Sequence, residues 1–253
     1  MPLETARSQS RLAPELTLPP PFTAIRLREV GDAFAHAVAI APEKGAGTLV
    51  YVGRFDLAEF AVVLEPDEPL LKARRTFYAG MAALADALAA HAQPETSIVI
   101  DWPDSFLVNG GLVGGGRLAW PEHTREIDTP PWLVFAGMIR TVSMTGAEPG
   151  LNPLVTALED EGFTDLMSGH VVESFARHLM VAIDAWQESG FGVVAKSYIE
   201  RLPREQGIRR DIDDNGDLLI RRMGKAEVVT RKKFLPRIVE PAWFDPQARG
   251  PRA

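Results

Sequence analysis

Residues 100–120 read IDWPDSFLVNGGLVGGGRLAW, and this stretch decides the fold more than any other part of the 253-residue chain. An apolar run ends at Trp102-Pro103, and a second short run ends at Asn109-Gly110, a pair that supplies the positive φ angles of a tight hairpin turn. The return run from 112 to 120 contains Gly114–Gly116. Three glycines within a strand predict either a bulge or a close approach of the backbone to a ligand.

Upstream of this hairpin the pattern predicts helices and strands in alternation. Asp32 precedes an apolar stretch and can cap a helix over residues 32–41. Residues 48–52 and 59–64 are β-branched or apolar runs typical of two strands. Residues 70–92 are rich in Ala, Leu and Met without proline, which predicts one long helix.

Downstream, residues 132–144 predict one central strand, or two strands joined by a bend. Asn152 followed by Pro153 is a good helix start, and Gly162 is a matching stop. Residues 168–189 carry apolar side chains at three-to-four spacing, which predicts a second strong helix.

The character of the sequence changes after Pro203. Residues 218–222 and 226–230 predict short strands next to the polar turn at 211–217, and residues 241–253 are expected to form a loose tail. The domain prediction is a flexible N-terminal arm (1–21), a main domain (22–203) and a small C-terminal β module with its tail (204–253). Hairpin strands mixed with helices favour an α+β fold with a largely antiparallel sheet flanked by helices.

Composition excludes several classes of function. The net charge is −7 and cysteine is absent, so nucleic-acid binding is not expected and thiol chemistry cannot occur. No apolar run is long enough for a membrane span and no targeting signal is evident, so we expect no membrane partner and a cytoplasmic location. The five histidines are scattered, and we assign none to a metal. A basic cluster from Arg221 to Arg237 favours a solvated face over a local anionic contact.

The quoted stretch resembles the central motif of biotin protein ligases, a Lys-Trp-Pro-Asn-Asp box followed by a hairpin and a glycine-containing return strand. Trp102 and Pro103 stand at the Trp and Pro of the box, and Asp104 at its Asn. Weaker similarity extends over residues 22–222, including Thr156-Ala157-Leu158 near the middle and the glycine turn DDNGDLL at 213–219.

The resemblance implies a fold like that of class II aminoacyl-tRNA synthetases and a two-step ligase reaction. Biotin or lipoate would be activated by ATP, with magnesium, as an acyl-adenylate, and a lysine of a biotinyl or lipoyl carrier protein would then take the acyl group. Both steps develop negative charge on phosphate oxygens, so the site needs positive side chains. Neither the acid nor the oligomeric state is specified by the sequence.

The chain departs from the family pattern where that positive charge is expected. Asp101 replaces the lysine of the box, and the glycine-arginine loop that covers the ligand in the family is reduced to Gly53-Arg54-Phe55-Asp56. Replacement cations are Arg54, Arg140 and Lys196. The candidate catalytic residues are therefore Asp101, Arg54, Arg140 and Lys196, and the candidate ligand-binding residues are Gly53, Trp102, Pro103, Asp104, Gly114, Gly115 and Gly116.

Three hypotheses remain open at this point. The first is an ATP-dependent ligase of a small carboxylic acid. The second is a module that binds an acyl ligand or a carrier protein without turnover, which Asp101 favours. The third is an acyl transferase that works without cysteine and without ATP.

Overall fold

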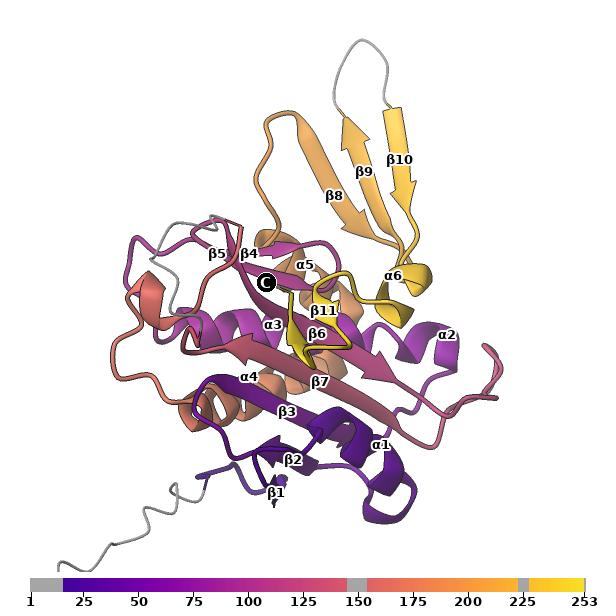
Figure 1. Ribbon diagram of the computed structural model, residues 1–253. Helices are drawn as coiled ribbons and strands as arrows, with labels where there is room; N and C mark the ends of the chain where they lie inside the picture. The colour runs from indigo at the N-terminus through magenta and orange to yellow at the C-terminus, as the bar shows by residue number, and fades with distance from the viewer. Residues whose placement is uncertain (1–15, 145–153, 223–227, 253) are drawn as a thin grey trace, which may run out of the picture.

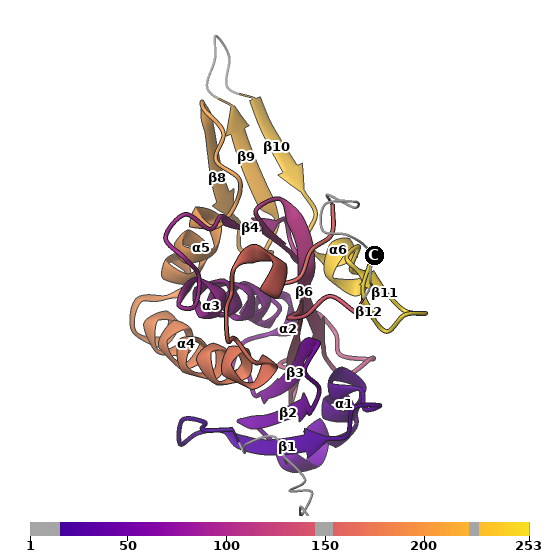
Figure 2. The same ribbon diagram turned by 60° about the vertical axis from the view of Figure 1, so that its left-hand side comes forward.

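The computed structural model describes residues 16–144, 154–222 and 228–252. Its centre is a seven-stranded sheet with helices on both faces, and a three-stranded sheet projects from one end (Figure 1). Helices α3, α4 and α5 cover one face of the large sheet, whereas α1, α6 and the short β11–β12 pair lie on the other (Figure 2). The observed class is α+β, as the sequence predicts.

The elements have the following bounds. The strands are β1 (Thr23–Leu27), β2 (Thr48–Val52), β3 (Leu57–Leu64), β4 (Ile98–Asp101), β5 (Ser105–Val108), β6 (Gly111–Ala119), β7 (Leu133–Arg140), β8 (Ile208–Ile212), β9 (Leu218–Arg222), β10 (Val228–Lys232), β11 (Phe244–Asp245) and β12 (Gly250–Pro251). The helices are α1 (Ala33–Lys44), α2 (Leu70–Ala73), α3 (Thr76–Ala89), α4 (Ser168–Ser189), α5 (Phe191–Glu200) and α6 (Leu235–Val239), with a 3-10 turn at Glu159–Glu161.

The large sheet has the order β1-β2-β3-β7-β6-β5-β4, and only the β1–β2 pair is parallel. Alternation along the strands divides the core into two layers. Phe60 and Phe135 face α3 and α4, while Ala61 and Val134 pack with α1. The second layer matters most for function, because only part of that face is covered by α1.

Several local predictions are confirmed. Asp32 caps α1 by accepting a hydrogen bond from the Ala35 amide at 2.8 Å. Asn109 and Gly110 both have positive φ, as the hairpin turn requires. Strands β2 and β9 have the predicted bounds, and the run at 132–144 contains one strand, β7, over Leu133–Arg140.

Two helix predictions are wrong. The helix expected over 70–92 is interrupted between α2 and α3, where the Arg75 and Phe77 amides bond to carbonyls three residues back. The helix expected to end at Gly162 is replaced, within the part that is described, by extended chain and the 3-10 turn. The reason is that the Thr156 amide bonds to Leu112 and the Leu158 amide to Arg140, at the ends of β6 and β7. Asn152 and Pro153 lie outside the described residues.

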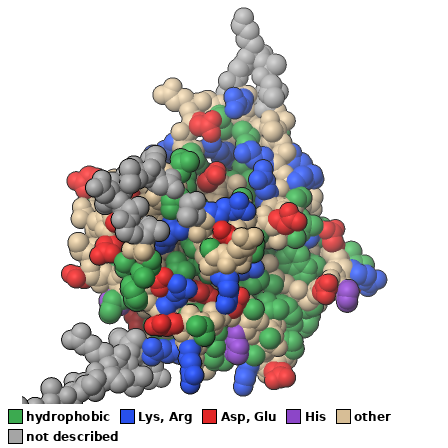
Figure 3. All heavy atoms as spheres, viewed as in Figure 1, with side chains coloured by type: hydrophobic (Ala, Val, Ile, Leu, Met, Phe, Trp, Pro, Cys, Tyr) green, Lys and Arg blue, Asp and Glu red, His purple; other side chains and the backbone are tan. Residues whose placement is uncertain are grey.

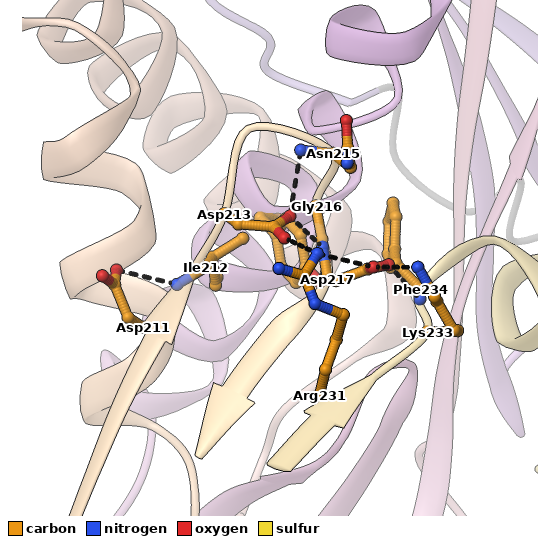
Figure 4. Close-up of polar contacts among 10 residues, drawn as sticks. Asp211, Ile212, Asp213, Asn215, Gly216, Asp217, Arg231, Lys233 and Phe234 are labelled. Atoms are coloured by element: carbon orange, nitrogen blue, oxygen red, sulfur yellow. Dashed lines mark hydrogen bonds and ion pairs between the residues drawn. The ribbon is translucent and has the colours of Figure 1, made fainter. Parts of the chain in front are cut away.

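The small sheet, of order β10-β9-β8, is held to the domain at its β8–β9 turn. Asp217 is buried there and accepts hydrogen bonds from the Phe234 amide at 3.0 Å and from Lys233 Nζ at 2.8 Å. Arg231 pairs with Asp213 and reaches Asp217 as well (Figure 4). Tyr78 of α3 donates a hydrogen bond to the Gly216 carbonyl oxygen at 2.6 Å, which joins the turn to the core.

The prediction of a loose C-terminal tail is wrong for residues 241–252. Trp243 is only 2% exposed, and β11 pairs with β12. The Arg252 amide donates to the Trp243 carbonyl oxygen at 2.8 Å. We call residues 241–252 the C-terminal segment. It lies on the α1 side of the sheet, over β6 and β7 (Figure 2).

Candidate functional site

A cavity of about 190 Å³ lies between the start of α1 and the C-terminal segment. Its floor is formed by three consecutive residues of β7, Ala136, Gly137 and Met138, and the small Ala136 side chain, which faces α1, leaves room above the sheet. Phe34, Trp243 and Phe244 form apolar walls. The charged residues that line it are Glu29, Asp32, Arg54, Glu59, Arg117 and Arg249.

Arg117 is the cation of this cavity whose donors are not engaged. Its guanidinium lies between two aromatic rings, 4.1 Å from the Phe34 centroid and 4.4 Å from the Phe244 centroid. Burial lowers the pKa of Arg117, and the carboxylates of Asp32 and Glu59 oppose that shift. Among the described residues it makes no hydrogen bond or ion pair. A positively charged group fixed by rings, with free donors, is suited to bind an anion.

Glu59 is the acid that faces the same cavity. It is 7% exposed, and its Oε1 accepts a hydrogen bond from the Ala33 amide at 2.9 Å, in the first turn of α1. Burial raises the pKa of Glu59, while this amide hydrogen bond partly offsets the rise. Within the part of the chain that the structure describes, Oε2 has no hydrogen-bond partner.

The other two cations of the cavity are already paired. Arg54 forms a two-point ion pair with Asp56, with Nε 2.7 Å from Oδ1, and this hydrogen bond raises the pKa of Arg54. Arg249 donates to the Gly31 carbonyl oxygen at 3.2 Å and lies 3.6 Å from Asp32 Oδ2. Both side chains therefore hold the walls of the cavity together.

Trp243 separates this cavity from the glycine strand. Its Nε1 donates to the Gly116 carbonyl oxygen at 3.2 Å, and a Cβ built on Gly115 would lie 2.4 Å from that nitrogen. Gly114 has a φ of 155°, opposite the register shift at Phe106/Leu107, and its Cβ would meet the Met138 carbonyl oxygen at 1.9 Å. These glycines thus serve a bulge and close packing of the chain on itself.

The turn after β4 carries the Trp-Pro pair on the far side of Trp243. Asp101 is exposed, and the Trp102–Pro103 bond is cis. The Pro103 carbonyl oxygen accepts a hydrogen bond from Tyr198 at 2.8 Å. Lys232 Nζ lies 5.9 Å from the centroid of the Trp102 ring, so a cation stands beside this turn although the box lysine is absent.

Asp104 is the buried acid of the same turn, at 3% exposure. Its Oδ1 accepts a hydrogen bond from Ser105 at 3.0 Å, whereas its Oδ2 has no partner among the described residues. Burial raises the pKa of Asp104 to about 6 despite that hydrogen bond. Trp102 Nε1 is likewise buried without a partner in the described chain.

The structure does not bring the remaining candidate residues together. Arg54 lines the cavity, but Arg140 donates to the carbonyl oxygens of Thr156, Pro251 and Arg252 at 3.2, 2.9 and 3.3 Å. Lys196 is exposed on α5, which lies on the opposite face of the sheet from α1 (Figure 2), and it does not line the cavity. Gly53 packs against Arg26, whose Nε would lie 2.5 Å from an added Cβ.

Sequence reasoning missed Arg117, Glu59 and the C-terminal segment as parts of a site. Arg117 directly follows the glycine run, and its alternation with Gly115 places both on the same face of β6. The two-residue alternation of side chains along a strand was therefore the sequence signal that could have identified Arg117. The approach of Trp243 and Phe244 from more than a hundred residues away gave no local signal.

The basic cluster between Arg221 and Arg237 lies on β9, β10 and α6. Lys and Arg side chains gather over this end of the molecule in Figure 3. Arg231 and Lys233 are engaged with Asp213 and Asp217, which agrees with a solvated structural face. In the described ranges no group of three or more His, Asp or Glu side chains is placed to hold a metal ion, and no helix is long and apolar enough to cross a membrane.

Comparison with known proteins identifies relatives of the whole central domain. The chain is 28% identical over 187 residues to a biotin–[acetyl-CoA-carboxylase] ligase of Paracoccus denitrificans, an alignment that covers 66% of this chain and 75% of the relative. A biotin protein ligase-like protein of unknown function from a Silicibacter species superposes with a TM-score of 0.71 at 26% identity, covering 85% of this chain and 96% of that one.

Biotin protein ligase from Aquifex aeolicus, in complex with biotin and ATP, shares the fold at 13% identity, with a TM-score of 0.60 and coverage of 83% and 99%. Residues 18–200 match the sequence profile of the biotin/lipoate A/B protein ligase family, which is more than half of the chain. The sheet order and the flanking helices agree with this match. The chain belongs to the biotin/lipoate A/B protein ligase family.

Proposed function

We propose that the protein is an ATP-dependent ligase that activates a small carboxylic acid as its acyl-adenylate and transfers the acyl group to a lysine of a carrier protein. The observation that carries the proposal is the cavity beside α1, in which Arg117 presents a guanidinium with unengaged donors. A family member without the box lysine needs another cation for the acid, and Arg117 meets that need. Arg54 adds positive charge nearby, although Asp56 holds it.

In the first step Arg117 binds and orients the acid. Charge-assisted hydrogen bonds from a planar guanidinium hold a carboxylate at two points, and the flanking rings keep the guanidinium from swinging away. One carboxylate oxygen then attacks the α-phosphorus of ATP, a P–O bond forms, and pyrophosphate leaves. The low water content of a partly buried cavity strengthens the attraction between cation and anion.

ATP itself is placed, in this proposal, on the side of the Trp102–Asp104 turn, so the Trp243 ring has to move before the acid and the α-phosphate can meet. One feature of the turn fits a nucleotide: Lys232, which is exposed, adds a positive charge beside the Trp102 ring. Magnesium would be held chiefly by the phosphates, since Mg²⁺ commonly binds through substrate phosphates and one or two carboxylates. Asp101 and Asp104 are the carboxylates of this turn.

In the second step the amine of a carrier lysine attacks the acyl carbonyl, an amide bond forms, AMP leaves and the amine loses a proton. Asp104, with its pKa near 6, is a candidate to accept that proton from the turn. The carrier is proposed to be a biotinyl or lipoyl carrier domain. Arg140 and Lys196 take no part in these steps, because neither lines the cavity.

The test is pyrophosphate release with a panel of acids that includes biotin, lipoate, octanoate and short-chain acids. The proposal expects release with at least one acid and loss of that release in Arg117→Met. The matched control, Arg125→Met, removes an exposed arginine that pairs only with Asp128. Absence of release across the panel contradicts the proposal.

A second candidate function is acid binding without turnover. Trp243 favours it, because its ring separates the cavity from the turn at which the nucleotide is proposed to bind. Calorimetry distinguishes the two functions: affinity for an acid that is indifferent to ATP, with no release of pyrophosphate, supports the binding module. Acyl transfer from an acylated carrier in the absence of ATP would instead support a transferase.

A further inference from the structure

Two of the six charged residues that line the cavity, Arg117 and Glu59, stand on strands of the large sheet and form a positive and a negative pole on one face of it. Arg117 of β6 is paired with Ala136 of β7, and Glu59 of β3 is paired with Met138 of β7. Directly paired residues point to the same face, and Ala136 and Met138 are two positions apart, so all four face α1. Arg117 and Glu59 therefore stand on either side of the cavity floor.

No hydrogen bond or ion pair joins the two poles within the described structure, although the Glu59 carboxylate raises the pKa of Arg117. β6 and β3 flank β7, so they lie two strand spacings apart, and the two paired positions on β7 differ by two residues. The Cα atoms of Arg117 and Glu59 are therefore separated by about 12 Å. The Arg117 guanidinium lies between the Phe34 and Phe244 rings, and Glu59 accepts a hydrogen bond from the Ala33 amide. Among the described residues Glu59 keeps a free carboxylate oxygen and Arg117 keeps free N–H donors, and both line the cavity, where a ligand with an acceptor at one end and a donor at the other can satisfy them.

The walls determine the size and shape of that ligand. The cavity of about 190 Å³ is smaller than the roughly 300–1,000 Å³ of common small-molecule sites. Trp243 sets this limit on the side of the glycine strand, and Ala136 and Gly137 leave a flat apolar floor between the poles. A short molecule with polar ends and an apolar middle fits these walls.

We infer that the acid taken by this site carries an N–H-bearing group at its far end, so that Arg117 binds its carboxylate and Glu59 accepts a hydrogen bond from its nitrogen. This inference rests on the proposed function and names its substrate class. Small ω-amino or amido carboxylic acids belong to the class. Plain fatty acids do not, because their methyl end would leave Glu59 without a partner.

The experiment compares three matched series by calorimetry: ω-amino carboxylic acids from β-alanine upward, alkanoates of equal chain length, and the corresponding alkylamines. We expect one amino acid of the series to bind at least about tenfold more tightly than both its alkanoate and its alkylamine. Glu59→Gln keeps an oxygen for the Ala33 amide and should abolish the preference for the ammonium group. Arg117→Met should abolish the preference over the alkylamine.

Exposed residues provide the matched controls. Glu122→Gln and Arg125→Met remove like charges outside the cavity and should leave every affinity unchanged. Equal affinity for amino acid and alkanoate, or a preference that survives in Glu59→Gln, overturns the inference. Circular dichroism of each variant checks that the fold is retained. Arg117→Lys keeps the positive charge, so it should recover part of the affinity that Arg117→Met loses.

Pyrophosphate release with the same compounds separates the two proposals. A binding preference without any release leaves the two-pole site standing and overturns the ligase proposal. Pyrophosphate release that is as fast with alkanoates as with amino acids, and that is unchanged in Glu59→Gln, supports the ligase proposal and overturns the two-pole site. Neither binding nor release with any compound overturns both.

Discussion

Trp243 Nε1 donates a hydrogen bond to the Gly116 carbonyl oxygen at 3.2 Å, across 127 positions of sequence. This contact places the indole over Gly115, the residue that the sequence suggests as the floor of a ligand site. The C-terminal segment therefore supplies a wall that the quoted motif lacks. The remaining cavity is displaced towards α1, where Arg117 and Glu59 face it.

The first prediction concerns Gly115. An added Cβ would lie 2.2 Å from the Asp104 carbonyl oxygen and 2.4 Å from Trp243 Nε1, so backbone and ring must move. We expect Gly115→Ala to lower the free energy of unfolding by about 1–3 kcal/mol, as overpacking does. Gly192→Ala in α5 is the control, because nothing lies within 4 Å of its added Cβ, and helix propensity predicts a small gain. Equal stability of the two variants in urea unfolding would contradict the prediction.

The second prediction concerns Asp104 and pH. Burial raises its pKa to about 6, so the folded chain holds the proton more tightly than the unfolded chain does. The stability from this group is fully present below its unfolded pKa, and it is lost as the pH rises through 6. Asp104→Asn cannot ionise, so its stability relative to wild type should increase between pH 4 and pH 8 by on the order of 3 kcal/mol.

Chemical denaturation at a series of pH values measures this difference. Asp160→Asn, at an exposed position of the 3-10 turn, is the control and should show no such trend. A constant difference between Asp104→Asn and wild type over this pH range would show that Asp104 does not titrate as proposed.

The third prediction concerns Asp217, whose contribution to stability depends on pH in the opposite direction to that of Asp104. Burial alone would raise its pKa, but hydrogen bonds from Lys233 and the Phe234 amide outweigh it, and the pKa lies below its usual value. The stabilisation is present above the unfolded pKa and is lost as the pH falls through the folded pKa. Asp217→Asn should cost about 1–3 kcal/mol at neutral pH, and the cost should shrink below pH 4. A cost independent of pH would argue against a charged Asp217.

The fourth prediction concerns Arg140, which donates to the carbonyl oxygens of Pro251 and Arg252. Arg140→Met removes these bonds, and we expect amide protons of the C-terminal segment to exchange about tenfold faster or more. Arg125→Met should leave that exchange unchanged. Unaltered protection of the Arg252 amide, which donates to Trp243, would mean that Arg140 does not hold the segment.

Local patterns sufficed for much of the fold. Asp32 as a cap, the Asn109-Gly110 turn and the run at 48–52 each depend on neighbours within a few residues, and each was predictable for that reason. The helix over 70–92 was not predictable in detail. Its interruption depends on Arg74 and Arg75 reaching Glu126, Glu68 and Asp214 elsewhere in the chain.

The site was less predictable than the fold because its parts meet only through tertiary contacts. The Trp-Pro motif identified the family, and Arg54, predicted as a replacement cation, lines the cavity but is paired with Asp56. Arg117 and Glu59 come together only through the order β3-β7-β6, and Trp243 reaches Gly116 only after the whole sheet is built. No window of sequence contains these relationships.

The most direct test of the account is a crystal structure with the acid that binds most tightly in the matched series. The account predicts its carboxylate at about 2.7–2.9 Å from the Arg117 guanidinium, between the Phe34 and Phe244 rings, with its nitrogen facing Glu59. An acid bound elsewhere, or bound in the cavity with its carboxylate away from Arg117, would contradict it.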